Sequence, residues 1–282
     1  MMEALALPFF RHAAIAALVL AGIHAYLGYH VVRRGVLFVD LALAQMAALG
    51  VAASVVLGHE HDEVAGYALA LGMTLVGAAL FAWLRGRSRR VPLEAHIGIV
   101  FATAQALAFL LLEKAPSGAE HLKETLVGSL FTVDPTRVAV VAGLYVVVGA
   151  VHWLLRRPFF EITQDPEAAQ ARGRRVFLWD FLFYATFGLV VTSAVQIAGV
   201  LLVFGFLVIP AVAGVMATDR TGLALAIGWT FGFSASVVGL LGSVRWDLPA
   251  APSILVALTA LLLVHGALLR LLRGGRGARA AG

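Results

Sequence analysis

Residues 178–217 read LWDFLFYATFGLVVTSAVQIAGVLLVFGFLVIPAVAGVMA, and this apolar stretch is the strongest indication of the fold. A helix needs about 20 apolar residues to cross the roughly 30 Å of hydrocarbon in a bilayer, at about 1.5 Å per residue. The stretch is about twice that length and is interrupted at Gln196 to Gly199. It therefore predicts two membrane spans, 178–195 and 199–217, or one kinked span followed by a half-helix.

The whole chain has the composition of a membrane protein. Of its 282 residues, 61% are hydrophobic and 13% are charged, and the mean hydropathy is +0.93. A soluble domain carries about a quarter of its residues as charges. This composition excludes a water-soluble enzyme and a disordered regulator, and the absence of cysteine excludes a disulfide scaffold.

Apolar stretches of span length recur along the rest of the chain. The further candidates are 12–31, 36–57, 65–84, 95–112, 137–155, 222–242 and 252–272. The first has no basic leader and no small-residue cleavage site, so we interpret it as a span and not as a signal peptide. The sequence predicts an all-α, polytopic transmembrane helical bundle of eight to nine spans, with one broken or half-helix near 196–217, formed as a single domain over 1–282.

Arginines cluster in alternate connections between these spans. They are Arg33, Arg34, Arg85, Arg87, Arg89, Arg90, Arg156, Arg157, Arg172, Arg174, Arg175, Arg220, Arg270, Arg273, Arg276 and Arg279. Cytoplasmic loops carry such an excess of positive charge, which places the amino terminus outside and the carboxyl terminus inside after nine crossings. The net charge of +5 is therefore an orientation signal, and no nucleic-acid partner is expected.

The longest basic connection, 156–177, contains signals for a short helix of its own. Thr163 or Asp165 is suited to the N-cap, Pro166 to the first helical position, Glu167 to the first turn and Gly173 to the C-terminal stop. A connection needs no helix, so we expect this one, at 166–172 on the cytoplasmic side, to meet a partner. The alternative is a solvated surface helix without a partner.

Several stretches in order along the chain carry a resemblance to a known family. They are Arg33-Arg34-Gly35 through Asp40 to Gln45, continuing to Ala52; Glu94-Ala95-His96-Ile97-Gly98-Ile99; Leu126 to Pro135; Asp165 to Gly173; and Gly199 to Ala211. Together they resemble the permease subunits of metal-ion ATP-binding-cassette (ABC) importers, which move zinc, manganese or iron.

The resemblance implies a function and a set of partners. It implies a homodimeric permease embedded in the lipid of the bacterial inner membrane. This permease would import a divalent transition-metal ion, with zinc and manganese as the first candidates. Its expected partners are a cytoplasmic ATPase and an external solute-binding protein. The loop 156–177 would hold the coupling helix, and Pro210 would be a hinge. The residues expected to couple to the ATPase are Asp165, Pro166, Glu167, Gln170, Arg172 and Gly173. The chain has no phosphate-binding Gly-Lys-Ser/Thr loop, so we expect ATP hydrolysis by a partner and no enzymatic activity of its own.

The expected metal-binding pair departs from the family pattern. In the family an Asp and a His four residues later lie about 40° apart on one helix. Here Gln45 stands where the His belongs and lies five residues after Asp40, which separates the side chains by about 140°. Asp40 remains a pathway candidate because a carboxylate within a span is costly. Its alternative is structural pairing with Arg33 or Arg34 near the helix start.

Histidines supply the other candidate positions. His24 lies in the middle of the first span and is the best-placed intramembrane candidate, although such a residue is more often satisfied by a backbone carbonyl. In the loop His59-Glu60-His61-Asp62-Glu63, His59 and His61 are candidates for attracting a divalent cation outside, or else part of a solvated acidic turn. We expect the metal ion as cargo and no cofactor bound by this chain.

Two alternatives remain open at the level of sequence. The same ABC permease architecture would carry a different cargo if the loss of the histidine changes selectivity. A gradient-driven secondary transporter would need several buried acids or a Lys-Asp pair near the midplane.

Overall fold

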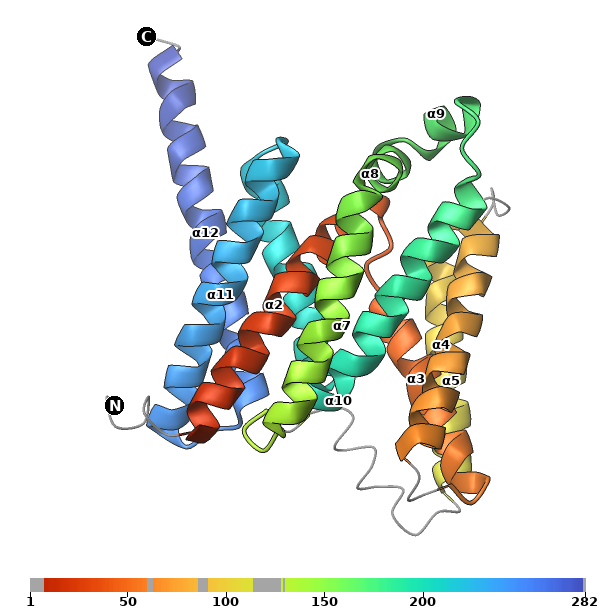
Figure 1. Ribbon diagram of the computed structural model, residues 1–282. Coiled ribbons are helices and arrows are strands. Elements are labelled where there is room, and N and C mark those ends of the chain that lie inside the picture. Colours follow the sequence, from red (N-terminus) through yellow and green to blue (C-terminus); the bar gives the residue numbers. More distant parts are fainter. Residues whose placement is uncertain (1–7, 60–62, 86–90, 114–127, 129, 281–282) are drawn as a thin grey trace. The chain divides into compact units, whose positions relative to one another are not determined.

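The computed structural model describes residues 8–59, 63–85, 91–113, 128 and 130–280, which are helical with no strand among them (Figure 1). The helices are α2 (Pro8–Arg34), α3 (Val39–Val56), α4 (Glu63–Arg85), α5 (Leu93–Leu112), α7 (Pro135–Leu154), α8 (Arg156–Gln164), α9 (Pro166–Ala171), α10 (Val176–Ala217), α11 (Thr221–Trp246) and α12 (Ala250–Ala280). Eight of these helices are long and apolar enough to cross a bilayer. The predicted all-α transmembrane architecture is thereby confirmed.

The helix α10 contains the break that the sequence predicts. Its 42 residues would extend about 63 Å as one straight helix, twice the thickness of the hydrocarbon. At Gly199 the backbone leaves helical geometry, with φ of 74° and ψ of 160°, so the element is two helices joined at this glycine. The predicted hinge residue, Pro210, lies within the second of them.

The chain divides into two compact units. One unit comprises His30–Gly128 and Thr136–Val200, and in it α3 packs against both α4 and α5 (Figure 1). Gly50 on α3 lies directly against the Leu69 carbonyl and the backbone of Ala70, where a Cβ atom would overlap them. Buried residues occupy all sides of α3, which explains its nearly uniform apolar sequence.

The other unit comprises Met1–Tyr29, Ser129–Pro135 and Leu201–Gly282. Small residues on α11 allow close helix contact there. Gly228 and Gly232 lie against Pro210, and Gly239 lies against the backbone of Ile254 on α12. The stripe of small residues on this span is therefore a packing surface.

The connection between α7 and α10 contains two helices, although the sequence signals predicted one. The predicted helix is α9, which follows Asp165 as its N-cap and ends before Gly173 at a φ of +84°. The additional helix, α8, escaped prediction because it is amphipathic and polar overall, with one buried side. That side is formed by Pro158, Phe159, Ile162 and Thr163.

Candidate functional site

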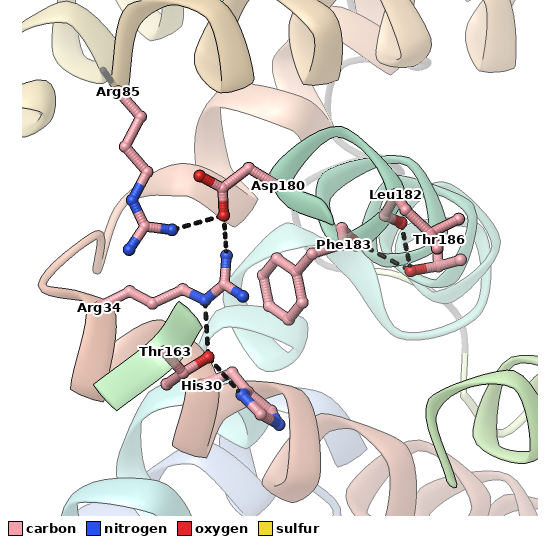
Figure 2. A network of polar contacts seen from close by, with 8 residues as sticks. All are labelled: His30, Arg34, Arg85, Thr163, Asp180, Leu182, Phe183 and Thr186. Atoms are coloured by element: carbon pink, nitrogen blue, oxygen red, sulfur yellow. Dashed lines mark hydrogen bonds and ion pairs between the residues drawn. The ribbon is translucent and has the colours of Figure 1, made fainter. Parts of the chain in front are cut away.

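A buried carboxylate joins two arginines in the unit that comprises His30–Gly128 and Thr136–Val200 (Figure 2). Asp180 Oδ1 accepts hydrogen bonds from Nη1 of Arg34 and Nη1 of Arg85, each at 2.7 Å. The side chains of Arg34 and Asp180 are fully buried, and that of Arg85 is 14% exposed. Three helices, α2, α4 and α10, are thus held together by a single carboxylate oxygen.

Arg34 extends this network to α8. Its Nε donates a hydrogen bond of 2.9 Å to Oγ1 of Thr163, near the end of α8. The same hydroxyl is hydrogen-bonded to Nδ1 of His30 at 2.8 Å. The Arg34 guanidinium also stacks over the ring of Phe183, 4.0 Å from its centroid, which is a cation–π contact. Figure 2 shows the guanidinium lying between Thr163 and Asp180.

The direction of α2 and α4 favours the two arginines at these positions. Arg34 and Arg85 are in the last turns of α2 and α4, where the helix dipole favours a positive charge. Asp180 is the fifth residue of α10, just beyond its first turn, so its charge is balanced by the two arginines. The network also brings Arg34, Arg85 and α8 to one end of this unit, in agreement with the alternation of basic connections in the sequence.

The apolar side of α8 is packed among aromatic rings and a second buried histidine. The rings of His152 and Phe159 stack at 4.4 Å between centroids, and His152 Nε2 is hydrogen-bonded to Oγ1 of Thr186 at 2.8 Å. Phe159 also contacts Trp179 at 5.7 Å and Phe183 at 6.2 Å. These contacts fix α8 against the ends of α7 and α10.

The helix α9 presents its polar side chains to the exterior. Asp165, Glu167, Gln170 and Arg172 are exposed, whereas Ala169 is fully buried. An open hollow of about 460 Å³ lies between α8 and α9, lined in part by Arg157, Glu161 and Gln164. This is a charged, concave surface suited to receiving side chains of another protein.

The predicted pathway residues on α3 are both buried. Asp40 is 1% exposed and Gln45 is 5% exposed. Arg34 makes its ion pair with Asp180 and not with Asp40, and Asp40 Oδ1 has no hydrogen-bond partner within the described residues. Glu94, from α5, accepts a hydrogen bond from the backbone N–H of Leu37, just before α3, where Phe38 provides no side-chain cap.

The histidine candidates differ in what the structure shows of them. His24 is buried, and its Nδ1 donates a hydrogen bond of 2.7 Å to the Leu20 carbonyl in its own helix. His59 is exposed, and His61 lies outside the described residues. The described part of the chain contains no cluster of three or more His, Cys, Asp or Glu side chains able to hold a metal ion.

Comparison with known proteins identifies the family. The profile of the ABC 3 transport family matches residues 6–268. The chain belongs to the ABC 3 transport family. It is a multi-pass membrane protein of this family, as the eight span-length helices among its described residues also indicate.

Several relatives of this ABC 3 family member are known by name. It is 28% identical to the "Manganese transport system membrane protein MntC" of Halalkalibacterium halodurans, covering 97% of this chain and 94% of that protein. It is 25% identical to the "Manganese import system permease protein ScaB" of Streptococcus gordonii, over 91% and 90% of the two chains. The structure "PsaBC from Streptococcus pneumoniae in complex with Fab" has the same fold, with a TM-score of 0.79, 24% identity and coverage of 94% and 93%.

The most connected acid of this ABC 3 family member, Asp180, is absent from the candidates that the sequence supplied. Asp40 is the acid that the sequence favours, because it lies inside a predicted span and within a stretch that resembles the family. Asp180 follows Arg175 by only five residues and lies at the edge of its span, where acids are common. The sequence signal that could have identified Asp180 is the occurrence of an acid near the start of one span together with arginines at the ends of other spans.

Proposed function

We propose that this chain is the permease subunit of an ABC importer for a divalent transition-metal ion, and that Mn²⁺ is its first candidate cargo. The observation that carries the proposal is the match to the ABC 3 transport family over residues 6–268. The names of the relatives supply the cargo, since they describe manganese transport and import. Zn²⁺ is the second candidate.

The proposed partner on the cytoplasmic side is a separate ATPase subunit that binds α9. The exposed residues Asp165, Glu167, Gln170 and Arg172 and the charged hollow beside them support this docking position. In this proposal ATP hydrolysis takes place on the partner, Pro166 and Gly173 set the two ends of the docking helix, and Pro210 bends as the spans move.

The remaining assembly is proposed from the family. A solute-binding protein delivers the ion to the outer face, where His59 and His61 attract it, and two copies of the permease enclose the pathway in the lipid bilayer. His24, Asp40 and Gln45 are the proposed pathway residues, and the ion passes as cargo with no cofactor held by the chain. The amino terminus lies outside and the carboxyl terminus inside.

Orientation is directly testable because the chain contains no cysteine. A single cysteine placed at His59 should react with a membrane-impermeant maleimide in intact cells. A single cysteine at Arg172 should react only after the membrane is permeabilised. The reverse labelling pattern would overturn the proposed orientation.

Transport is tested by reconstituting the permease with its ATPase and binding protein in vesicles and measuring uptake of radioactive Mn²⁺. Uptake should require ATP on the ATPase side and should stop when residues 166–172 are replaced by a Gly-Ser linker. Uptake by the permease alone, without the ATPase, would show a gradient-driven transporter instead.

The second candidate function is the same importer with another cargo, and Gln45 is the observation that favours it. An amide oxygen is a poorer ligand than imidazole for Zn²⁺. Competition of Mn²⁺ uptake by Zn²⁺, Fe²⁺ and Co²⁺ in the same vesicles distinguishes the cargoes.

A further inference from the structure

We infer that the Thr163 hydroxyl, acting through Arg34, is the positioning group that transmits movement of α9 to the membrane spans. The inference deepens the proposed function and rests on α9 being the site where the ATPase docks. It assigns a role to Thr163 and Arg34, whose side chains are buried, whereas the polar residues of α9 are exposed.

The first step is that α8 and α9 form a braced corner. Asp165 is at once the C-cap of α8 and the N-cap of α9, and its side chain accepts a hydrogen bond of 2.9 Å from the N–H of Ala168. Beyond α9, Arg174 Nε donates to Glu161 Oε2 on α8 at 3.0 Å. A displacement of α9 is therefore carried to α8, because bonds on both sides of α9 return to that helix.

The second step is that the Thr163 side chain connects α8 to the membrane span α2 by hydrogen bonds. Its hydroxyl joins His30 and Arg34 in the last two turns of α2. The other polar contacts shown for α8 are local, since Arg156 bonds to the Trp153 carbonyl and Glu161 to Arg174. The rest of its buried side makes apolar and ring contacts, which slide more readily than directional hydrogen bonds do.

The third step is that Arg34 converts this bond into a connection among three spans. Its guanidinium is planar and rigid, so Nε and Nη1 must move together. Nε holds Thr163 and Nη1 holds Asp180, which in turn holds Arg85 on α4. A shift of Thr163 that keeps its bond to Nε must therefore move the Asp180 pair or break it.

Asp180 is suited to such a rearrangement. Both arginines use Oδ1, while Oδ2 is buried and has no hydrogen-bond partner within the part of the chain that the structure describes. One arginine can transfer to Oδ2 without leaving the carboxylate. The network can thus change its geometry while its charges remain paired, which is the property a two-position coupling element requires.

The test uses the complete transporter, permease with ATPase and binding protein, in vesicles. The variants are Thr163→Val, which keeps the shape but not the hydroxyl, and Thr163→Ser, which restores the hydroxyl. Thr192→Val is the matched control, because Thr192 is equally buried and its hydroxyl bonds to Thr74 at 3.1 Å, away from α8. The quantity measured is Mn²⁺ transported per ATP hydrolysed, together with retention of the ATPase during purification.

Thr163→Val should retain the ATPase and lower the ratio of Mn²⁺ to ATP by about fivefold or more, the lower end of typical coupling between sites. Thr163→Ser should restore the ratio, and Thr192→Val should leave it unchanged. Arg34→Lys, which keeps the charge without the rigid fork, should lower the ratio as Thr163→Val does. If Thr163→Val does not assemble with the ATPase, the ratio measured for Arg34→Lys tests the inference in its place.

Any one of four results would overturn the inference. They are a normal ratio in Thr163→Val, a normal ratio in Arg34→Lys, a loss in Thr163→Ser equal to that in Thr163→Val, and an equal loss in Thr192→Val. If replacement of α9 by a Gly-Ser linker abolishes uptake while Thr163→Val transports normally, the proposed function stands and the relay is wrong. If uptake survives replacement of α9, the coupling role of α9 itself is wrong.

Discussion

The two arginines that share Asp180 should contribute unequally to stability, and the pair of variants Arg34→Gln and Arg85→Gln measures the difference. Arg34 is fully buried and makes hydrogen bonds to Thr163 and Asp180 as well as a ring contact with Phe183. Arg85 is partly exposed and, among the residues that the structure describes, makes one hydrogen bond, to Asp180. Either variant leaves Asp180 paired with the other arginine.

The magnitudes follow from these contacts. A hydrogen bond to a charged group contributes about 1.5–3 kcal/mol, so the loss of two predicts about 3–6 kcal/mol for Arg34→Gln. The cation–π contact adds about 1 kcal/mol. For Arg85→Gln we expect about 1–2 kcal/mol, because its single bond is partly solvated and the glutamine amide can still donate to Asp180.

The double variant provides a stronger test. With both arginines replaced, Asp180 is a buried carboxylate without a counter-charge, a condition that costs about 3–5 kcal/mol when a buried pair is broken. The double variant should therefore lose more stability than the sum of the two single variants. The free energies of unfolding are measured by dodecyl sulfate titration of the purified protein in mixed micelles. An equal loss in the two single variants, or an additive double variant, would refute this account of the network.

Three further predictions concern other parts of the chain. Gly50→Ala should destabilise the protein by about 1–3 kcal/mol, because the added Cβ would overlap the neighbouring backbone of α4. Gly72→Ala has no atom near its added Cβ and should be neutral or stabilise the protein by up to about 1 kcal/mol. The same dodecyl sulfate titration compares the two variants. Asp165→Ala should cost α9 about 1 kcal/mol by removing its N-cap, and hydrogen exchange at the Ala168 amide should accelerate. Asp40→Asn should abolish Mn²⁺ uptake in vesicles while leaving the melting temperature unchanged or raised, because it neutralises a buried carboxyl; retained uptake would remove Asp40 from the pathway.

The spans were predictable from sequence because the signal for each is local. Apolar windows of about 20 residues placed every long helix to within a few residues at most ends, as at 95–112 for α5 (Leu93–Leu112). The interruption at Gln196 to Gly199 also predicted the break in α10 correctly, since glycine accepts the positive φ found at residue 199. At the carboxyl end, 252–272 fell short of α12 (Ala250–Ala280) because the helix continues into a polar segment.

The short helices were only half predictable. Asp165, Pro166 and Gly173 mark α9 through N-cap, first-turn and C-terminal preferences that depend on adjacent residues. The helix α8 has no comparable cap, and its N-cap residue Leu155 makes no side-chain bond. Its stability comes from burying Phe159 and Ile162 against other helices, which a reading of nine residues alone does not reveal.

The charge network could not be found from local sequence, because Arg34 and Arg85 are 146 and 95 residues from Asp180. The positions of its charges nevertheless agree with the alternation of arginine-rich connections along the sequence. Arginines that end two spans on the same side lie at the negative ends of those helix dipoles, and Asp180 lies just beyond the first turn of a third helix. Each arginine is favoured by its own helix before the three helices meet. Packing then replaces water with the opposite charge, which reduces the cost of burying all three. Arg34 and Arg85, which end α2 and α4, therefore also join membrane spans through Asp180. A search for buried acids should begin where a span starts on the arginine-rich side.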